Sequence, residues 1–154
     1  MNPAPFQRFL DENRDHVWRF LVAAVGRDAA DDCFQETFMA ALSAYPRTRV
    51  ENPRGWVLTI AHRKALDHHR ARARRPVPVG AVPEVPAPPA PETAGDGVWA
   101  RVRDLPPKQR AALLLRFAGD LSHREIAAVL DCSEDAARRS AHEGLKRLRE
   151  ELAA

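Results

Sequence analysis

The sequence has few cysteines and no long apolar run, and each shortage narrows the possible structures. Its two cysteines, Cys33 and Cys132, lie far apart and have no Cys or His at metal-ligand spacing. A disulfide framework is therefore excluded, and both side chains are expected to be small buried hydrophobes in a reducing compartment. No run of about 18 apolar residues and no basic-then-apolar leader occur, so we expect a cytoplasmic protein without membrane insertion.

Strand patterns and catalytic motifs are also missing. Glycine is sparse, at 7 of 154 residues, and β-branched or aromatic residues rarely alternate with polar ones, so no strand is predicted. There is no H-E-x-x-H, Gly-rich phosphate loop or nucleophile elbow. The neighbours Asp67, His68 and His69 point in different directions around a helix. We therefore expect no catalytic site, no metal and no cofactor.

Proline, by contrast, is abundant and divides the chain. Of the 13 prolines, 7 lie between Pro76 and Pro91, where no helix survives. We predict an all-α fold of two small helical domains, over 5–75 and 98–152, joined by a Pro-rich linker over 76–97.

Apolar spacing and capping residues outline the helices. One helix is expected over 5–25, ended by Gly26, and Asp28 is expected to cap a second through Ala44. Asn52 is expected to cap a third, with Pro53 at its first position, extending toward Arg75. In the second domain, a short helix near 98–104 and another over 106–117 precede two more.

Those last two helices have the pattern of a helix-turn-helix. Ser122 and Glu125 form a capping box for a short helix, and Ser133 caps a longer one after the turn over 131–133. The longer helix has an apolar stripe at Ala137, Ala141, Leu145, Leu148 and Leu152. Its opposite side is basic, with Arg138, Arg139, His142, Lys146 and Arg149. Such a helix is able to enter the DNA major groove, although a basic face is often only solvated surface.

The third helix carries a second basic cluster. Arg54, Arg63, Lys64, Arg70, Arg72, Arg74 and Arg75 crowd into about twenty residues, with Trp56 near the start. This composition favours phosphate contacts and base stacking on exposed nucleic acid. The alternative, which the sequence leaves open, is that Trp56 plugs the core of the three-helix domain.

The second helix differs in charge. Asp31, Asp32, Gln35 and Glu36 make an acidic, polar patch beside Phe38 and Met39. Such a patch repels DNA and suits a basic protein surface, although acids near a helix start are also common for electrostatic reasons.

These segments, in this order, resemble the extracytoplasmic-function (ECF) sigma factors of bacterial RNA polymerase. Residues 31–38 are similar to the family's D-x-x-Q-E-T-F motif, and residues 52–61 and 66–70 to its P-R-x-W-L-x-x-I-A and L-D-x-x-R stretches. Residues 105–110, 125–127 and 145–149 match the L-P-x-x-x-R, E-I-A and closing segments of its second domain.

The resemblance implies a sigma region 2-like domain followed by a region 4-like helix-turn-helix domain. It implies binding to core RNA polymerase, recognition of promoter DNA as duplex and as melted single strand, nucleoid association, and restraint by an anti-sigma factor. The loop from Tyr45 to Asn52 and the third helix would hold the melted strand. The expected polymerase-binding residues are Asp32, Gln35, Glu36 and Phe38. The expected DNA-binding residues are Arg54, Trp56, Arg63, Lys64, Arg70, Ser122, Arg124, Arg138, Arg139, His142 and Lys146.

Some residues depart from the family's pattern. Asp131 stands where glycine is usual in the turn, and Gly144 lies inside the last helix, where glycine costs about 1 kcal/mol relative to alanine. Two other readings compete with a sigma factor. One is a freestanding helix-turn-helix regulator, which has no need of the acidic patch; the other is a small nucleic-acid-processing enzyme, for which no catalytic cluster is found.

Overall fold

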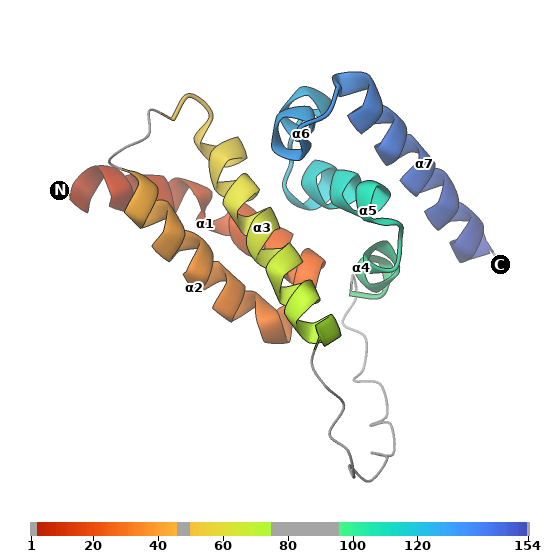
Figure 1. Cartoon of the computed structure of the whole chain (residues 1–154), viewed down its shortest axis with the longest axis horizontal. Helices are drawn as coiled ribbons and strands as arrows, with labels where there is room; N and C mark the ends of the chain where they lie inside the picture. Colours follow the sequence, from red (N-terminus) through yellow and green to blue (C-terminus); the bar gives the residue numbers. More distant parts are fainter. Residues whose placement is uncertain (1–2, 46–49, 75–95, 154) are drawn as a thin grey trace, which may run out of the picture.

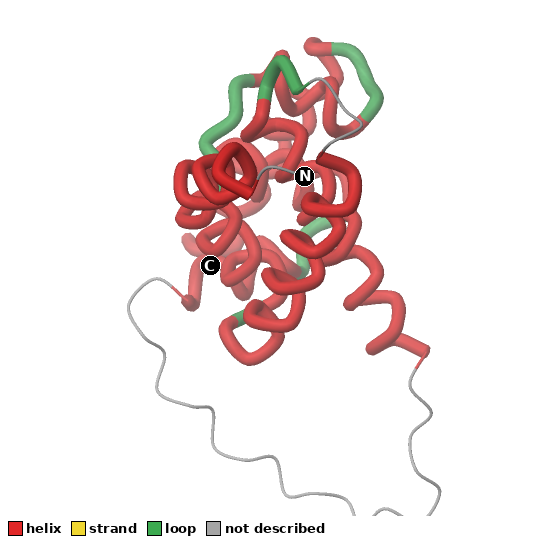
Figure 2. The backbone as a smooth tube through the Cα atoms, turned by 90° about the vertical axis from the view of Figure 1, so that its left-hand side faces the viewer, coloured by secondary structure: helices red, strands yellow, loops and turns green. Residues whose placement is uncertain are grey.

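The computed structural model describes residues 3–45, 50–74 and 96–153, and within these ranges the chain is helical with no strand (Figure 2). The all-α prediction is confirmed. The predicted linker over 76–97 lies outside the described residues except for its last two positions, as do Arg75 and positions 46–49 of the loop after Tyr45. None of the described helices is both long and apolar enough to cross a bilayer.

Helices α1 (Pro3–Val25) and α2 (Arg27–Ala44) are separated by a single residue. Gly26 has φ of +84°, a conformation that glycine adopts without steric cost, and its N–H donates to the Val22 carbonyl at 2.9 Å. Because the N-cap residue is Gly26, which has no side chain, α2 begins without a side-chain cap. The prediction that Asp28 caps α2 is therefore wrong: Asp28 lies in the first helical turn.

Helix α3 (Pro53–Arg74) begins as the sequence predicts. The Gly55 N–H donates to Asn52 Oδ1 at 3.2 Å, so Asn52 satisfies one of the free amides at the start of the helix. A Cβ at Gly55 would lie 2.7 Å from Asn52 Nδ2, which is too close. Glycine thus leaves room here for the capping side chain to fold back onto the helix; a larger residue would make the Asn52 side chain shift.

The second half of the chain contains α4 (Asp96–Arg103), α5 (Pro107–Leu113), η2 (Leu114–Ala118), α6 (His123–Leu130) and α7 (Glu134–Ala153). The expected helix over 106–117 is thus an α-helix that widens into a π-helical segment. Its last turn is closed by the Gly119 N–H, which donates to the Leu114 carbonyl at 2.9 Å. The segment then reverses at Asp120, whose φ is +57°.

The helix-turn-helix has the predicted caps. The Glu125 N–H donates to Ser122 Oγ at 3.1 Å and the Ser122 N–H donates to Glu125 Oε1 at 3.0 Å, which completes the capping box. Asp131 adopts the left-handed conformation that ends α6, and the Ala136 N–H donates to Ser133 Oγ at 3.0 Å. Cys132 is exposed in this turn, so only Cys33 is the buried hydrophobe that we expected of both.

Helix α1 contacts both halves of the chain. It packs against α2 and α3 and also against α4 and η2. In Figure 1 it begins at the left edge of the molecule and runs behind α2 and α3. Its Val17, Phe20 and Leu21 are fully buried in one continuous core that also contains Leu115 and Leu121. Burying each such side chain contributes about 1.5–3 kcal/mol. This packing brings α3 alongside α6.

Candidate nucleic-acid interface

Helix α7 presents a basic face to solvent. Arg138, Arg139, His142 and Lys146 are all exposed, while Ala137, Ala141 and Leu148 are buried against the rest of the domain. This orientation follows from the helical period, which places the two sets on opposite sides. Helix α7 lies at the right-hand edge of the molecule in Figure 1. The face is accessible along its length for a DNA groove.

The first two arginines of this face are in different electrostatic states. Arg138 Nη2 lies 3.1 Å from Glu134 Oε1, and its Nη1 lies 3.4 Å from Asp135 Oδ1, so two carboxylates of the first turn hold its guanidinium. Arg139 forms no ion pair within the part of the chain that the structure describes. Arg139 is therefore the cation of this turn that is available to an incoming base or phosphate without exchange of a partner.

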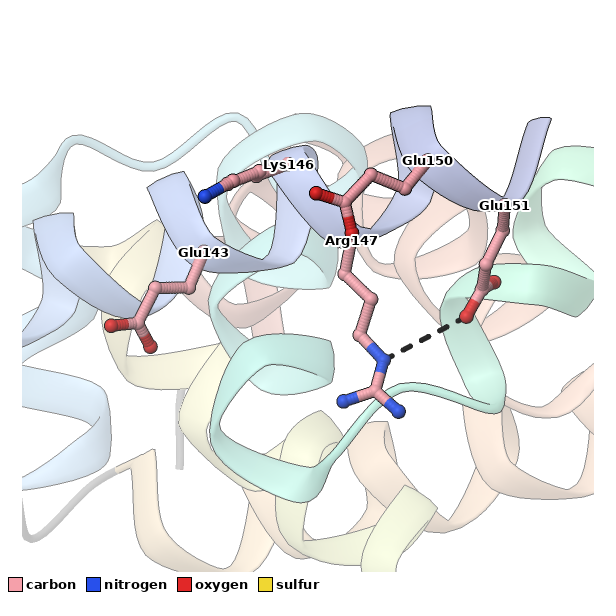
Figure 3. Close-up of a pocket in the computed structure, with 5 residues that line it drawn as sticks. All are labelled: Glu143, Lys146, Arg147, Glu150 and Glu151. Carbon is pink, nitrogen blue, oxygen red and sulfur yellow. Dashed lines mark ion pairs between the residues drawn. The ribbon is translucent and has the colours of Figure 1, made fainter. Parts of the chain in front are cut away.

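The second half of α7 has mixed charge around a shallow open hollow. Figure 3 shows its lining, which comes from this helix alone: Glu143, Lys146, Arg147, Glu150 and Glu151. Arg147 points toward Glu151, with Nε 3.7 Å from Oε1, while Lys146 points elsewhere. Because three acids accompany two bases, the hollow is a poor site for phosphate.

At the start of α6, Ser122 and Arg124 differ in availability. The Ser122 hydroxyl already accepts the Glu125 N–H, so its part in the cap limits what else it binds. Arg124 is exposed and lies in the first turn of the helix. Between them, Arg124 is the stronger candidate for a phosphate contact.

The neighbours of Trp56 bear on whether its ring stacks on a base or packs in the core of the first domain. Its ring lies edge-on to Phe9, with centroids 5.6 Å apart, and 6.5 Å from the ring of Tyr45. The side chain is half-buried and packs against the core. Trp56 thus belongs to the core of the first domain, and only its remaining exposed part is free to stack on a base.

The other cations of α3 divide between two faces. Arg63 and Arg70, seven positions apart, are exposed, whereas Lys64 is half-buried. Burial and the nearby Glu36 and Asp32 raise the pKa of the Cys33 thiol, while Lys64 opposes them, so Lys64 lies toward α2. The structure therefore groups Arg63 with Arg70 but does not group Lys64 with them.

The acidic surface of α2 is exposed as expected, with one exception. Asp32, Gln35 and Glu36 face solvent at helical spacing, next to Met39, whose exposed fraction is 70%. Phe38 is only 6% exposed, and its ring packs 4.9 Å from that of Phe34. The expectation that Phe38 lies on the docking surface therefore needs correction: it faces the core, because it shares the inward side of α2 with Cys33.

Two contacts where the N-terminal end of α3 meets that of α6 were missed by sequence reasoning. Asn52 Nδ2 donates to Glu125 Oε2 at 2.7 Å, and Arg54 Nη1 lies 4.0 Å from Asp120 Oδ2. Burial by itself would raise the pKa of Glu125, but hydrogen bonds from Ser122 and Asn52 outweigh it and hold this pKa below its ordinary value. No sequence signal marks these contacts, because the partners are about 70 positions apart.

Candidate metal ligands do not gather in the parts of the chain that are described, where no group of three or more His, Cys, Asp or Glu residues is arranged to hold an ion. The arrangement within residues 3–45, 50–74 and 96–153 instead offers binding surfaces of opposite charge on α2 and α7.

Comparisons with known families agree with this arrangement. Residues 9–75 match Sigma-70 region 2, and residues 97–148 match Sigma-70 region 4. The ECF RNA polymerase sigma factor SigC of Mycobacterium tuberculosis is 34% identical over 137 residues, covering 85% of this chain and 74% of the relative. SigD of the same organism is 35% identical over 164 aligned residues, covering 94% and 76%.

Solved structures share the fold. The sigma factor RpoE of Bartonella quintana, crystallised with the anti-sigma factor NepR, matches 97% of this chain and 98% of its own, with a TM-score of 0.79 and 22% identity. CnrH in complex with the cytosolic domain of CnrY matches with a TM-score of 0.73 and 21% identity, covering 99% and 90%. The freestanding-regulator alternative is not favoured, because both sigma regions are matched. The chain belongs to the ECF sigma factors of bacterial RNA polymerase.

Proposed function

We propose that this sigma factor docks on core RNA polymerase through the exposed acidic face of α2 and reads promoter DNA through α3 and α7. The observation that carries the proposal is the separation of charge: Asp32, Gln35 and Glu36 face solvent on one domain, and the basic face of α7 does so on the other. An acidic surface suits a basic protein partner, and a basic helix suits DNA. Met39 replaces Phe38 in the proposed docking surface.

The DNA-binding residues divide by role. Arg63, Arg70 and Arg124, all exposed, are suited to phosphate contacts, which position the protein without reading sequence. Arg139, with His142 and Lys146 along the same face, is suited to the major groove, where an arginine that reads guanine contributes about 1–3 kcal/mol of discrimination. Arg138 would first have to exchange its carboxylate partners. The factor itself makes and breaks no bond; it supplies recognition to the polymerase.

Two further expectations concern partners and place. RpoE was solved with the anti-sigma factor NepR, and CnrH with the cytosolic domain of CnrY; we propose that this chain likewise has an anti-sigma partner. Since promoters and polymerase are its targets, we place its action in the cytoplasm, at the nucleoid.

Copurification with bacterial core RNA polymerase tests the docking surface. We expect the wild-type chain to form a stoichiometric complex and the Gln35→Ala/Glu36→Ala variant to lose it, because truncation removes the acidic centre of the face. The matched control is Gln7→Ala/Glu12→Ala, which removes the same residue types from an exposed part of α1. A wild type that fails to bind core, yet shifts duplex DNA, would overturn the proposal in favour of a freestanding regulator.

A further inference from the structure

A carboxylate lies within the basic face of α7. Glu143 is exposed and lies one turn after Arg139 and just under one turn before Lys146, while Ala141 on the other side of the helix is buried. The helical period places the three exposed side chains in one stripe along the helix. A negative charge is therefore part of the surface that we propose enters the DNA groove.

The Glu143 carboxylate is not neutralised by the cations around it. The carboxylates of the first turn of α7 hold Arg138, but Glu143 has no ion-pair partner among the residues that the structure describes. Arg147, at the spacing that favours a pair with Glu143, instead has its Nε 3.7 Å from Glu151 Oε1. Figure 3 shows Arg147 directed toward Glu151, with Lys146 pointing in another direction. The oxygens of Glu143 are therefore free to accept from an incoming donor.

The backbone that carries this carboxylate is held in place by packing. Gly144, the next residue, is buried where α7 meets α5, and a Cβ there would lie 3.0 Å from Leu113 Cδ1. Such close packing leaves α7 little freedom to rotate about its own axis. Glu143 consequently stays on the outward side of the helix, at a well-defined position on the domain.

Electrostatics limits what this carboxylate is able to bind in duplex DNA. Phosphate oxygens repel it, and so do the acceptor atoms that guanine and thymine present in the major groove. Adenine presents its N6 donor beside the N7 acceptor, whereas cytosine presents the N4 amino donor without an adjacent acceptor. Cytosine is therefore the base whose edge best fits an unpaired carboxylate.

We propose that Glu143 is a specificity-determining residue of α7, which accepts a hydrogen bond from the N4 amino group of a cytosine in the promoter duplex. This inference rests on the proposed reading of duplex DNA by α7. Opposite any other base, the carboxylate loses its water without gaining an equivalent donor, and binding weakens. Glu143 thus gives selectivity at one base pair and lowers the general attraction of α7 to phosphates.

Selection from a duplex DNA library of random sequence tests the assignment. Core RNA polymerase carrying the full-length sigma factor is incubated with the library, and the bound DNA is sequenced. We expect one position at which the wild type prefers cytosine by at least about fivefold over each other base. For Glu143→Gln we expect the preference at this position to change to adenine, because a glutamine amide pairs with N6 and N7 of adenine. The preferences at other positions should stay as they are.

The matched control is Glu150→Gln, which removes the same charge from an exposed position two turns further along α7. It corrects for the general rise in DNA affinity when acidic charge is lost. If both variants bind the library more tightly to the same extent and leave every base preference unchanged, Glu143 is only a surface charge and the inference is overturned. A wild type that prefers cytosine at no position overturns it as well.

Arg139→Ala separates this inference from the proposed function. We expect this variant to lose a preference for guanine at a different position of the selected sequence. If Arg139→Ala changes a base preference and Glu143→Gln changes none, only the assignment of Glu143 fails. If neither variant changes any preference, α7 does not read duplex DNA, and the proposed function of this helix fails together with the inference.

Discussion

At the residue scale, the pKa of His62 depends on the contact between the two halves of the chain. His62 lies on α3, with its ring 6.4 Å from that of Phe20, and faces Arg110 of α5. Burial, followed by the charges of Arg110 and Arg63, lowers the pKa of His62 from 6.5 to about 4. The imidazole is therefore neutral in the folded protein at pH 7.

This depressed pKa predicts a loss of stability in acid. The unfolded chain takes up the His62 proton near pH 6.5, whereas the folded chain does so only near pH 4. The contribution of His62 to the free energy of unfolding is therefore fully present above pH 6.5. As the pH falls from 6.5 to about 4, this contribution is lost, and the loss is on the order of 3 kcal/mol. Urea unfolding between pH 7 and 4.5 should show a shallower pH dependence for His62→Gln than for wild type. An identical slope would contradict the expected neutral, buried state.

Also at the residue scale, Glu125 makes two interactions, of which the sequence predicted only one. One carboxylate oxygen completes the capping box with Ser122, as the S-x-x-E spacing predicts, and the other reaches Asn52 in the first domain. A helix cap is a local interaction between residues that are close in sequence. The hydrogen bond with Asn52 exists only because the fold brings α3 next to α6.

At the element scale, the packing of α7 on α5 explains Gly144. Judged on helix propensity alone, this glycine looked merely unfavourable, but it is buried at the point where the two helices meet. A Cβ there would lie 3.0 Å from Leu113 Cδ1 and 3.3 Å from Gln109 Cβ. Glycine allows a close approach that orients the recognition helix.

A larger side chain at this point should therefore destabilise the second domain. We expect Gly144→Val to lower the free energy of unfolding by about 1–3 kcal/mol, because Leu113 is fully buried and has little room to move. Thermal melting followed by circular dichroism measures the change. Ala128→Val, at an exposed position of α6, is the control for the lower helix propensity of valine. Equal melting temperatures for the two variants would show that the contact is not tight.

At the scale of the whole molecule, α1 packs against helices of both domains. Its buried Val17, Phe20 and Leu21 belong to a core that continues into η2 and α4. Each domain alone would leave part of this surface uncovered, and exposing it costs free energy in proportion to the apolar area. The sequence, with its Pro-rich division, predicts two separate domains, and the structure adds the interface between them.

A shared core predicts cooperative unfolding of the full chain. We expect one thermal transition, with the calorimetric enthalpy equal to the van't Hoff enthalpy, because separating the domains exposes apolar surface on both. Scanning calorimetry provides the measurement, and the Asp120→Asn/Glu125→Gln variant tests whether weakening the α3–α6 contact splits the transition. Two well-resolved transitions in the wild type would mean that the interface contributes little to stability.

The sequence by itself determined the local features, because each depends on residue spacing within one or two helical turns. These features are the Asn52 and Ser122 caps, the basic face of α7 and the acidic face of α2. It could not show that Phe38 turns inward while Met39 is exposed, since both follow the same acidic run. Nor could it place Arg54 opposite Asp120, or Asn52 opposite Glu125. Such pairings depend on how whole helices pack, and packing sums many weak contacts between residues far apart in sequence. Only the tertiary structure decided them.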